Sequence, residues 1–187
     1  MSLATPSLLR RRDGASSGRV TAVELFFDLV FVFAVTQLSH TLLEALTPAG
    51  ALRTALLLTA VWWVWIYTSW VTNWLDPERA PVRLCLFVLM LAGLLLSVSI
   101  PEAFGERGLL FAGAYAFMQV GRTLFFLWAV RGGPFNMVRN FQRILVWLTL
   151  SGLVWIAGGL AEGGLRLALW ALALLVEFVS PWLYFRV

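Results

Sequence analysis

Several ionisable side chains interrupt stretches of this sequence that are otherwise apolar. Carboxylate and guanidinium groups in such positions can bind ions or transfer protons. Asp28, Arg122 and Glu177 each lie well inside such a stretch. If the stretches cross a membrane, a charged group near the centre costs about 3 kcal/mol or more, so it usually faces a partner or water and marks a functional or structural site. We therefore predict an ion or solute pathway formed by Glu24, Asp28, Asn73, Arg122 and Glu177.

Three of these charged groups are expected at a similar depth in the membrane. With a rise of about 1.5 Å per residue, Asp28 lies about 9 Å inside the hydrocarbon, and Arg122 and Glu177 each lie about 12 Å inside. We expect Arg122 to be hydrogen-bonded to Asp28, to Glu177 or to both, because a guanidinium fits carboxylate oxygens. The same cluster is also explained as a structural ion-pair lock that fixes the helices without touching a substrate.

A second polar group is expected toward the opposite membrane surface. His40 and Glu44 are four residues apart, so their side chains can meet on a helix, and Glu44 could fix the tautomer of the imidazole. The pair could serve as acid and base, or it could be a satisfied local pair with no further role. Nothing resembling a nucleophile accompanies it, so we predict no catalytic residue and no enzyme.

The composition excludes several kinds of reactive site and also a domain that folds in water. The chain has no lysine, one histidine and one cysteine, which excludes a Schiff base, a Walker A phosphate site, an internal disulfide and a zinc site, and we expect no metal or cofactor. Its residues are 60% hydrophobic and 13% charged, whereas a soluble domain carries about a quarter charged residues. Such a chain cannot cover itself with a polar surface, so we predict a membrane protein whose main partner is the lipid bilayer.

Six stretches are long and apolar enough to cross a bilayer, which takes about 20 residues. They predict an all-α integral membrane protein, because the apolar runs lack the alternation of a β-barrel strand. The basic tail over residues 1–19 is predicted to be disordered, and residues 20–187 to form one six-helix transmembrane domain. The predicted helices cover about 22–46, 51–75, 82–100, 108–130, 143–160 and 165–185.

The arginines predict which way the helices face, because cytoplasmic loops keep an excess of positive residues. With the N-terminus inside, ten arginines lie on that side and three on the other, so we expect both termini to be cytoplasmic. The net charge of +4 is then a topology signal, and no nucleic acid is expected as a partner. The ten are Arg10, Arg11, Arg12, Arg19, Arg79, Arg83, Arg131, Arg139, Arg143 and Arg186, and the three are Arg53, Arg107 and Arg166.

Three segments carry a longer pattern: VELFFDLVFVFAVTQLSH at residues 23–40, WVTNWLDPERAPVR at 70–83 and MQVGR at 118–122. They resemble the bacterial low temperature requirement protein A family. The resemblance extends over about residues 19–187 and implies a multi-span protein of the bacterial inner membrane whose molecular activity is poorly defined. The residues that match the family's motifs are Glu24, Phe27, Asp28, His40, Asn73, Asp76, Arg79 and Arg122.

Members of that family are usually about twice as long as this chain and have a second set of spans. We expect this chain to be either a half-length form that pairs with itself or a fragment whose partner half is absent. A site formed between two halves would then be completed by a second copy, so the resemblance implies a homo-oligomer.

A second, fainter resemblance concerns the first span. The pattern around Phe27 and Asp28 is similar to the first helix of the bacterial relatives of the lysosomal potassium channel, which are six-span subunits assembled around a pore lined by that helix. Those relatives carry a serine where this chain has Phe27.

These patterns predict a channel-like or transporter-like subunit that moves a small ion or solute past the layer of Asp28, Arg122 and Glu177. The alternative is a non-transporting membrane scaffold or lipid-interacting protein, in which the same charges only hold the helices together. A third hypothesis is an intramembrane enzyme that uses His40 and Glu44 as acid and base.

Overall fold

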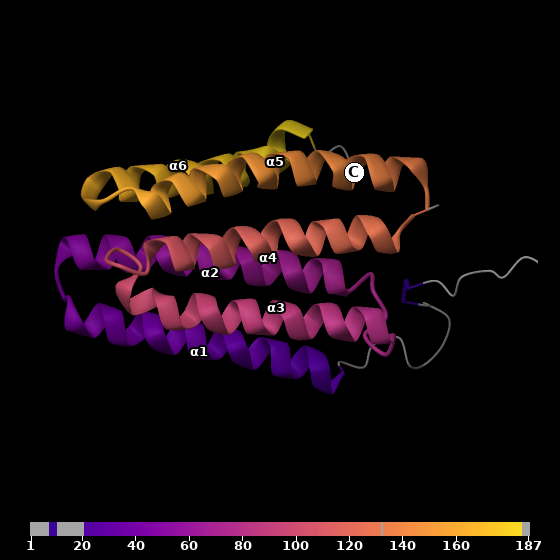
Figure 1. The fold of residues 1–187 in the computed structure, drawn as a ribbon, viewed down its shortest axis with the longest axis horizontal. Helices are drawn as coiled ribbons and strands as arrows, with labels where there is room; N and C mark the ends of the chain where they lie inside the picture. Colours follow the sequence, from indigo (N-terminus) through magenta and orange to yellow (C-terminus); the bar gives the residue numbers. More distant parts are fainter. Residues whose placement is uncertain (1–7, 11–20, 132, 185–187) are drawn as a thin grey trace, which may run out of the picture.

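Six long helices run back and forth along the long axis of the molecule (Figure 1). The structure is a computed structural model that describes residues 8–10, 21–131 and 133–184. All six helices are long and apolar enough to cross a membrane, as the hydropathy predicts. They are α1 (Ala22–Glu44), α2 (Pro48–Thr72), α3 (Ala80–Ser99), α4 (Gly108–Ala129), α5 (Phe135–Leu160) and α6 (Gly163–Tyr184), with the short 3₁₀ helix η1 (Ile100–Glu102) after α3.

Four helices begin earlier than the hydropathy predicts: α3 and α6 by two residues, α2 by three and α5 by eight. Local signals explain the two largest differences. Thr47 caps α2, because its hydroxyl accepts a hydrogen bond from the Gly50 N–H at 3.1 Å and Pro48 takes the first helical position. α5 begins at Phe135 rather than near residue 143. Hydropathy detects only the most apolar part of a helix, whereas the first two turns of α5 mix apolar residues with asparagine, arginine and glutamine and continue the same helix.

A capping box closes the N-terminus of α1. The Thr21 hydroxyl accepts a hydrogen bond from the Glu24 N–H at 3.3 Å, and the Glu24 carboxylate accepts one from the Thr21 N–H at 2.8 Å. The same carboxylate forms an ion pair with Arg10 at 3.0 Å. Glu24 therefore fixes the start of α1 and ties it to the preceding segment.

Leu8–Arg10, part of the predicted tail, lie against the loop between α2 and α3. Leu9 forms an isolated antiparallel β-bridge with Leu75, flanked by backbone hydrogen bonds of 2.9 and 3.0 Å. These three residues are therefore held by backbone pairing. The remaining tail residues, with Arg11, Arg12 and Arg19, and Arg186 near the C-terminus lie outside the described residues.

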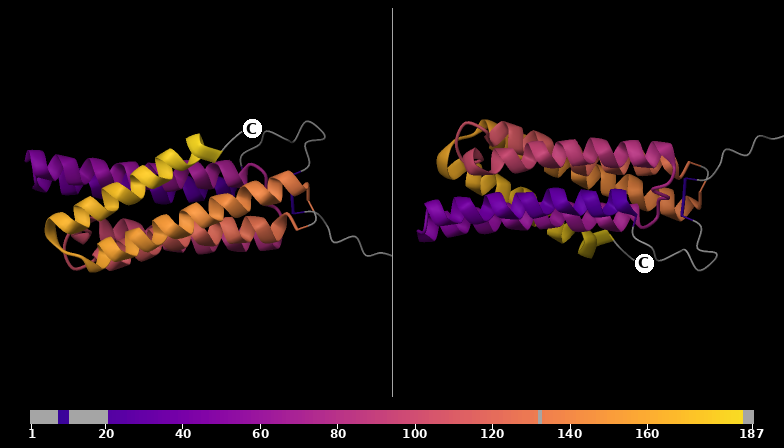
Figure 2. Two further views of the ribbon diagram at one scale, coloured as in Figure 1. Left: turned by 90° about the horizontal axis from the view of Figure 1, so that it is seen from above. Right: turned by 90° about the horizontal axis from the view of Figure 1, so that it is seen from below.

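The helices pack so that α4 lies against α3 on one side and α5 on the other, while α5 also packs against α6. α1 packs against α2 and α3 (Figure 2). In α1 and α6 only 28% of the apolar span is buried, so their outer faces contact lipid or another polypeptide. Buried residues recur every three or four positions along α4 and form one face, which includes Phe111, Tyr115, Met118, Arg122 and Phe126.

Arg166 joins two loops at one end of the bundle. Its Nε donates to the carbonyls of Gly158 and Ala161 at 3.2 and 2.9 Å, at the C-terminal end of α5. Its Nη1 donates to the carbonyls of Ala103 and Gly105 at 2.9 and 2.7 Å, in the loop between α3 and α4. A helix C-terminus leaves carbonyls without partners, and a guanidinium supplies five donors, which explains why this arginine is only 5% exposed.

α4 and α5 approach each other closely at Gly159. A Cβ atom built there would lie 3.0 Å from the Cβ of Ala112 and 3.0 Å from the Cα of Leu109. The crossing therefore depends on the absence of a side chain, as is common where membrane helices meet.

We predict that Gly159→Val destabilises the protein by about 2 kcal/mol, because the added atoms force α4 and α5 apart. The measurement is thermal unfolding in detergent, followed with a thiol-reactive dye that reports on Cys85, the one cysteine of the chain. Gly164→Val is the matched control, since a Cβ atom there meets nothing within 4 Å. Equal melting temperatures for the two variants would contradict the prediction.

Candidate functional site

One carboxylate in the interior of the bundle receives four hydrogen bonds. Glu177 of α6 is 3% exposed. Its Oε1 accepts from the Ser151 hydroxyl at 2.6 Å and from the Trp155 indole N–H at 3.2 Å, both on α5. Its Oε2 accepts from the Tyr115 hydroxyl at 2.7 Å and from the Gln119 amide at 2.9 Å, both on α4. Four neutral donors thus replace the water that this carboxylate loses on burial.

The Gln119 side chain links this carboxylate to a buried cation. Its amide nitrogen donates to Glu177, and its amide oxygen accepts a hydrogen bond from Nη2 of Arg122 at 2.6 Å. Nη1 of Arg122 donates to the Thr68 hydroxyl at 2.8 Å and to the Val64 carbonyl at 3.3 Å, both on α2. One amide therefore connects a guanidinium and a carboxylate that do not touch each other.

We refer to this network as the polar core. It joins α2, α4, α5 and α6, and Arg122 within it is 2% exposed. Within the described part of the chain, the Nε of Arg122 is one of two buried side-chain nitrogens without a hydrogen-bond partner. The members of the polar core are Thr68, Tyr115, Gln119, Arg122, Ser151, Trp155 and Glu177.

Asp28 does not belong to the polar core. The structure brings Arg122 and Glu177 into one network, but the described residues contain no ion pair between Arg122 and either Asp28 or Glu177. The expectation of direct guanidinium–carboxylate hydrogen bonds is therefore wrong. Depth estimates place a residue along its helix but not around it, and Asp28 is directed toward α2 instead.

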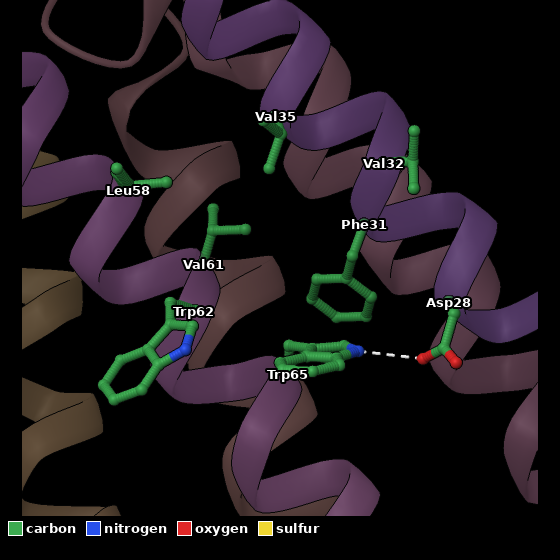
Figure 3. Close-up of a pocket in the computed structure, with 8 residues that line it drawn as sticks. All are labelled: Asp28, Phe31, Val32, Val35, Leu58, Val61, Trp62 and Trp65. Atoms are coloured by element: carbon green, nitrogen blue, oxygen red, sulfur yellow. Dashed lines mark hydrogen bonds between the residues drawn. The ribbon is translucent and has the colours of Figure 1, made fainter.

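Asp28 lines an open groove between α1 and α2 (Figure 3). Its Oδ1 accepts a hydrogen bond from the Trp65 indole N–H at 2.8 Å, and no other hydrogen bond or ion pair reaches its carboxylate from the described residues. The groove has a volume of about 390 Å³, which is within the range of small-molecule sites. Apart from Asp28 the lining is apolar or aromatic: Phe31, Val32, Val35, Leu58, Val61, Trp62 and Trp65.

Glu24 and Asn73 lie near the ends of their helices. Glu24 is occupied by the capping box and by Arg10, as described above. Asn73 is exposed, and its backbone N–H donates to the Ser69 carbonyl at 3.2 Å where α2 ends. Neither side chain shares a hydrogen bond with the polar core in the described structure.

His40 and Glu44 are both exposed on α1. The described residues show no hydrogen bond or ion pair between them, because four-residue spacing permits a contact without enforcing it at an open helix surface. The predicted pairing is therefore not formed. The ranges that the structure describes also contain no group of three or more His, Cys, Asp or Glu side chains that could hold a metal ion.

None of the four neutral donors around Glu177 was predicted from the sequence. The spacing of Tyr115, Gln119 and Arg122 is i, i+4, i+7, which puts all three on one face of α4. Ser151 and Trp155 are likewise four residues apart on α5. A polar residue repeated at helical spacing within an apolar span is the signal that could have found them.

Comparison with known proteins finds similarity to one family. The model of the family described as bacterial low temperature requirement A protein matches residues 19–186. An uncharacterized protein of Rhizobium meliloti (strain 1021) is 48% identical over 171 residues, which are 91% of this chain and 42% of that protein. The chain therefore spans less than half the length of this relative. No solved structure matches the chain.

We predict that Arg122→Leu and Glu177→Leu each destabilise the protein by about 3 kcal/mol, because each leaves a buried partner uncompensated. The double variant should cost at least about 1 kcal/mol less than the two single costs combined, since it removes both charges. Denaturant titration in detergent micelles measures these free energies of unfolding. Combining Arg122→Leu with Asp28→Asn is the control, and we expect additive costs there. Additivity in both pairs would show that Gln119 does not couple the charges.

Proposed function

Because the chain belongs to the bacterial low temperature requirement A protein family and carries charged groups inside its six apolar helices, we propose that it is a channel-like or transporter-like subunit that moves a small ion or solute across a membrane. Asp28 is the observation that carries this proposal. It lies within a span, in an open groove, beside one neutral donor. A carboxylate in that position needs a proton, a cation or water beside it, and these are the species that a permeation route holds.

The polar core has a different role in this proposal. Arg122 and Glu177 are satisfied through Gln119 and through neutral donors, so they fix the helices around the route. Through Thr68 they position α2, which forms one wall of the groove at Asp28. Glu24 and Asn73 mark the end of the bundle from which the route is reached.

Two further parts of the proposal concern assembly. The chain spans less than half of its relative, and the outer faces of α1 and α6 are the least buried of the bundle. We place a second copy of the chain against these faces, which makes the working unit a homo-oligomer. Lipid covers the apolar surface that remains.

A non-transporting scaffold is the second candidate, and the polar core favours it. The core is buried, and its oxygens and most of its donors have partners inside one chain. A closed network of this kind can hold helices together without any substrate. The two candidates differ in whether Asp28 is needed for flux.

We predict that proteoliposomes containing the protein show a flux of protons or of a monovalent cation, inorganic or organic, and that Asp28→Asn lowers it about tenfold or more by removing the charge on the route. Ion-sensitive dyes inside the vesicles measure the flux of protons and inorganic cations, and uptake of a radiolabelled organic cation measures the flux of the other class. Glu162→Gln, an exposed carboxylate between α5 and α6, is the matched control and should leave the flux unchanged. Flux that is equal in wild type and Asp28→Asn would exclude the proposed route, and no flux for any tested ion would support the scaffold.

We further propose that the protein lies in the bacterial inner membrane with both termini in the cytoplasm, since most of its arginines fall on that side. In a Cys85→Ser background, a membrane-impermeant maleimide applied to spheroplasts should label Glu162→Cys between α5 and α6 but not Glu78→Cys between α2 and α3. Both side chains are exposed, so access to the reagent decides the outcome. The reverse labelling pattern would invert the topology.

A further inference from the structure

We propose that the groove between α1 and α2 binds an organic cation with an apolar body, such as an aryl-substituted amine, ammonium or phosphonium ion. The cationic centre lies at Asp28, and the apolar groups lie against the aromatic side chains of the groove. This inference rests on the proposed function, for which it names the class of substrate.

The charge of Asp28 is the first argument. Trp65 occupies Oδ1 but brings no positive charge, and Oδ2 accepts no hydrogen bond from the described residues. The buried guanidinium of Arg122 is engaged by Gln119 and Thr68, so it does not balance this carboxylate. A carboxylate in hydrocarbon is stabilised by a cation, and here the described part of the chain supplies none in contact with it.

The lining of the groove is the second argument, because it favours binding of an organic cation over an inorganic one. A metal ion exchanges its hydration shell for several oxygen ligands. Asp28 is the one residue with a carboxylate among those that line the groove, and no hydroxyl or amide side chain accompanies it. A bare inorganic ion would therefore lose most of its ligands, whereas an alkyl or aryl cation has a weakly hydrated charge.

The aromatic residues are the third argument. Figure 3 shows the Phe31 ring over the indole of Trp65, with Trp62 toward one side of the groove and Asp28 toward the other. Trp62 is 46% exposed, so its ring is open to a ligand. Aromatic faces attract cations within about 6 Å and also bury apolar surface. A carboxylate beside such walls matches both the charge and the body of an organic cation.

The test uses the full chain in phosphatidylcholine nanodiscs and radiolabelled tetraphenylphosphonium as the probe, with empty nanodiscs as background. We expect saturable binding that Asp28→Asn weakens about tenfold or more. Tetraphenylborate has nearly the same shape but the opposite charge, and should not compete. Glu162→Gln is the charge-matched control and should bind as wild type does. Leu58→Trp fills the groove from an exposed position on its rim and should also weaken binding about tenfold.

Two results would overturn the inference. Equal binding by wild type, Asp28→Asn and Leu58→Trp would place the probe elsewhere, and competition by tetraphenylborate would show a slot that selects for shape alone. Leu58→Trp decides the matter if Asp28→Asn fails to fold. Failure of the inference is distinct from failure of the proposed function: binding without flux would retain the site and reject transport, and flux of an inorganic cation without probe binding would do the opposite.

Discussion

Inside hydrocarbon no water solvates a charged side chain, so protein groups must compensate its charge. The architecture depends on how this is done for Arg122 and Glu177. A side-chain amide resolves this because it has a donor at one end and an acceptor at the other. Gln119 accepts from the guanidinium and donates to the carboxylate, so the two charges are coupled across a gap that neither bridges alone. The link reaches α2 through Thr68 and α6 through Glu177, two helices that have few direct contacts.

The number and type of the helices could be predicted from the sequence, since six apolar runs of sufficient length leave few alternatives. The start of α5 at Phe135 could not, because Asn136, Arg139, Asn140 and Gln142 lower the hydropathy of its first two turns. The β-bridge between Leu9 and Leu75 could not be predicted either, since it depends on backbone pairing rather than on side-chain type. Residues held by hydrogen bonds between distant backbone segments carry little local pattern.

The sequence predicted how deep the site residues lie along their helices, but not the direction in which their side chains point. Counting residues along each helix put Arg122 and Glu177 in one layer, and the polar core does join them. Asp28 was assigned to the same layer, but rotation about α1 turns it toward Trp65. Two chemical environments result. In the closed one, neutral donors satisfy the carboxylate of Glu177; in the open one, Oδ2 of Asp28 accepts no hydrogen bond from the described residues. Depth alone could not distinguish them.

Arg166 has a mechanical consequence for the whole bundle. By holding carbonyls of Gly158 and Ala161 together with those of Ala103 and Gly105, it clamps two neighbouring loops at a single point. The opposite end is tied in a different way, by the Leu9–Leu75 backbone pairing and the Arg10–Glu24 ion pair, so loops are fastened at both extremities of the molecule.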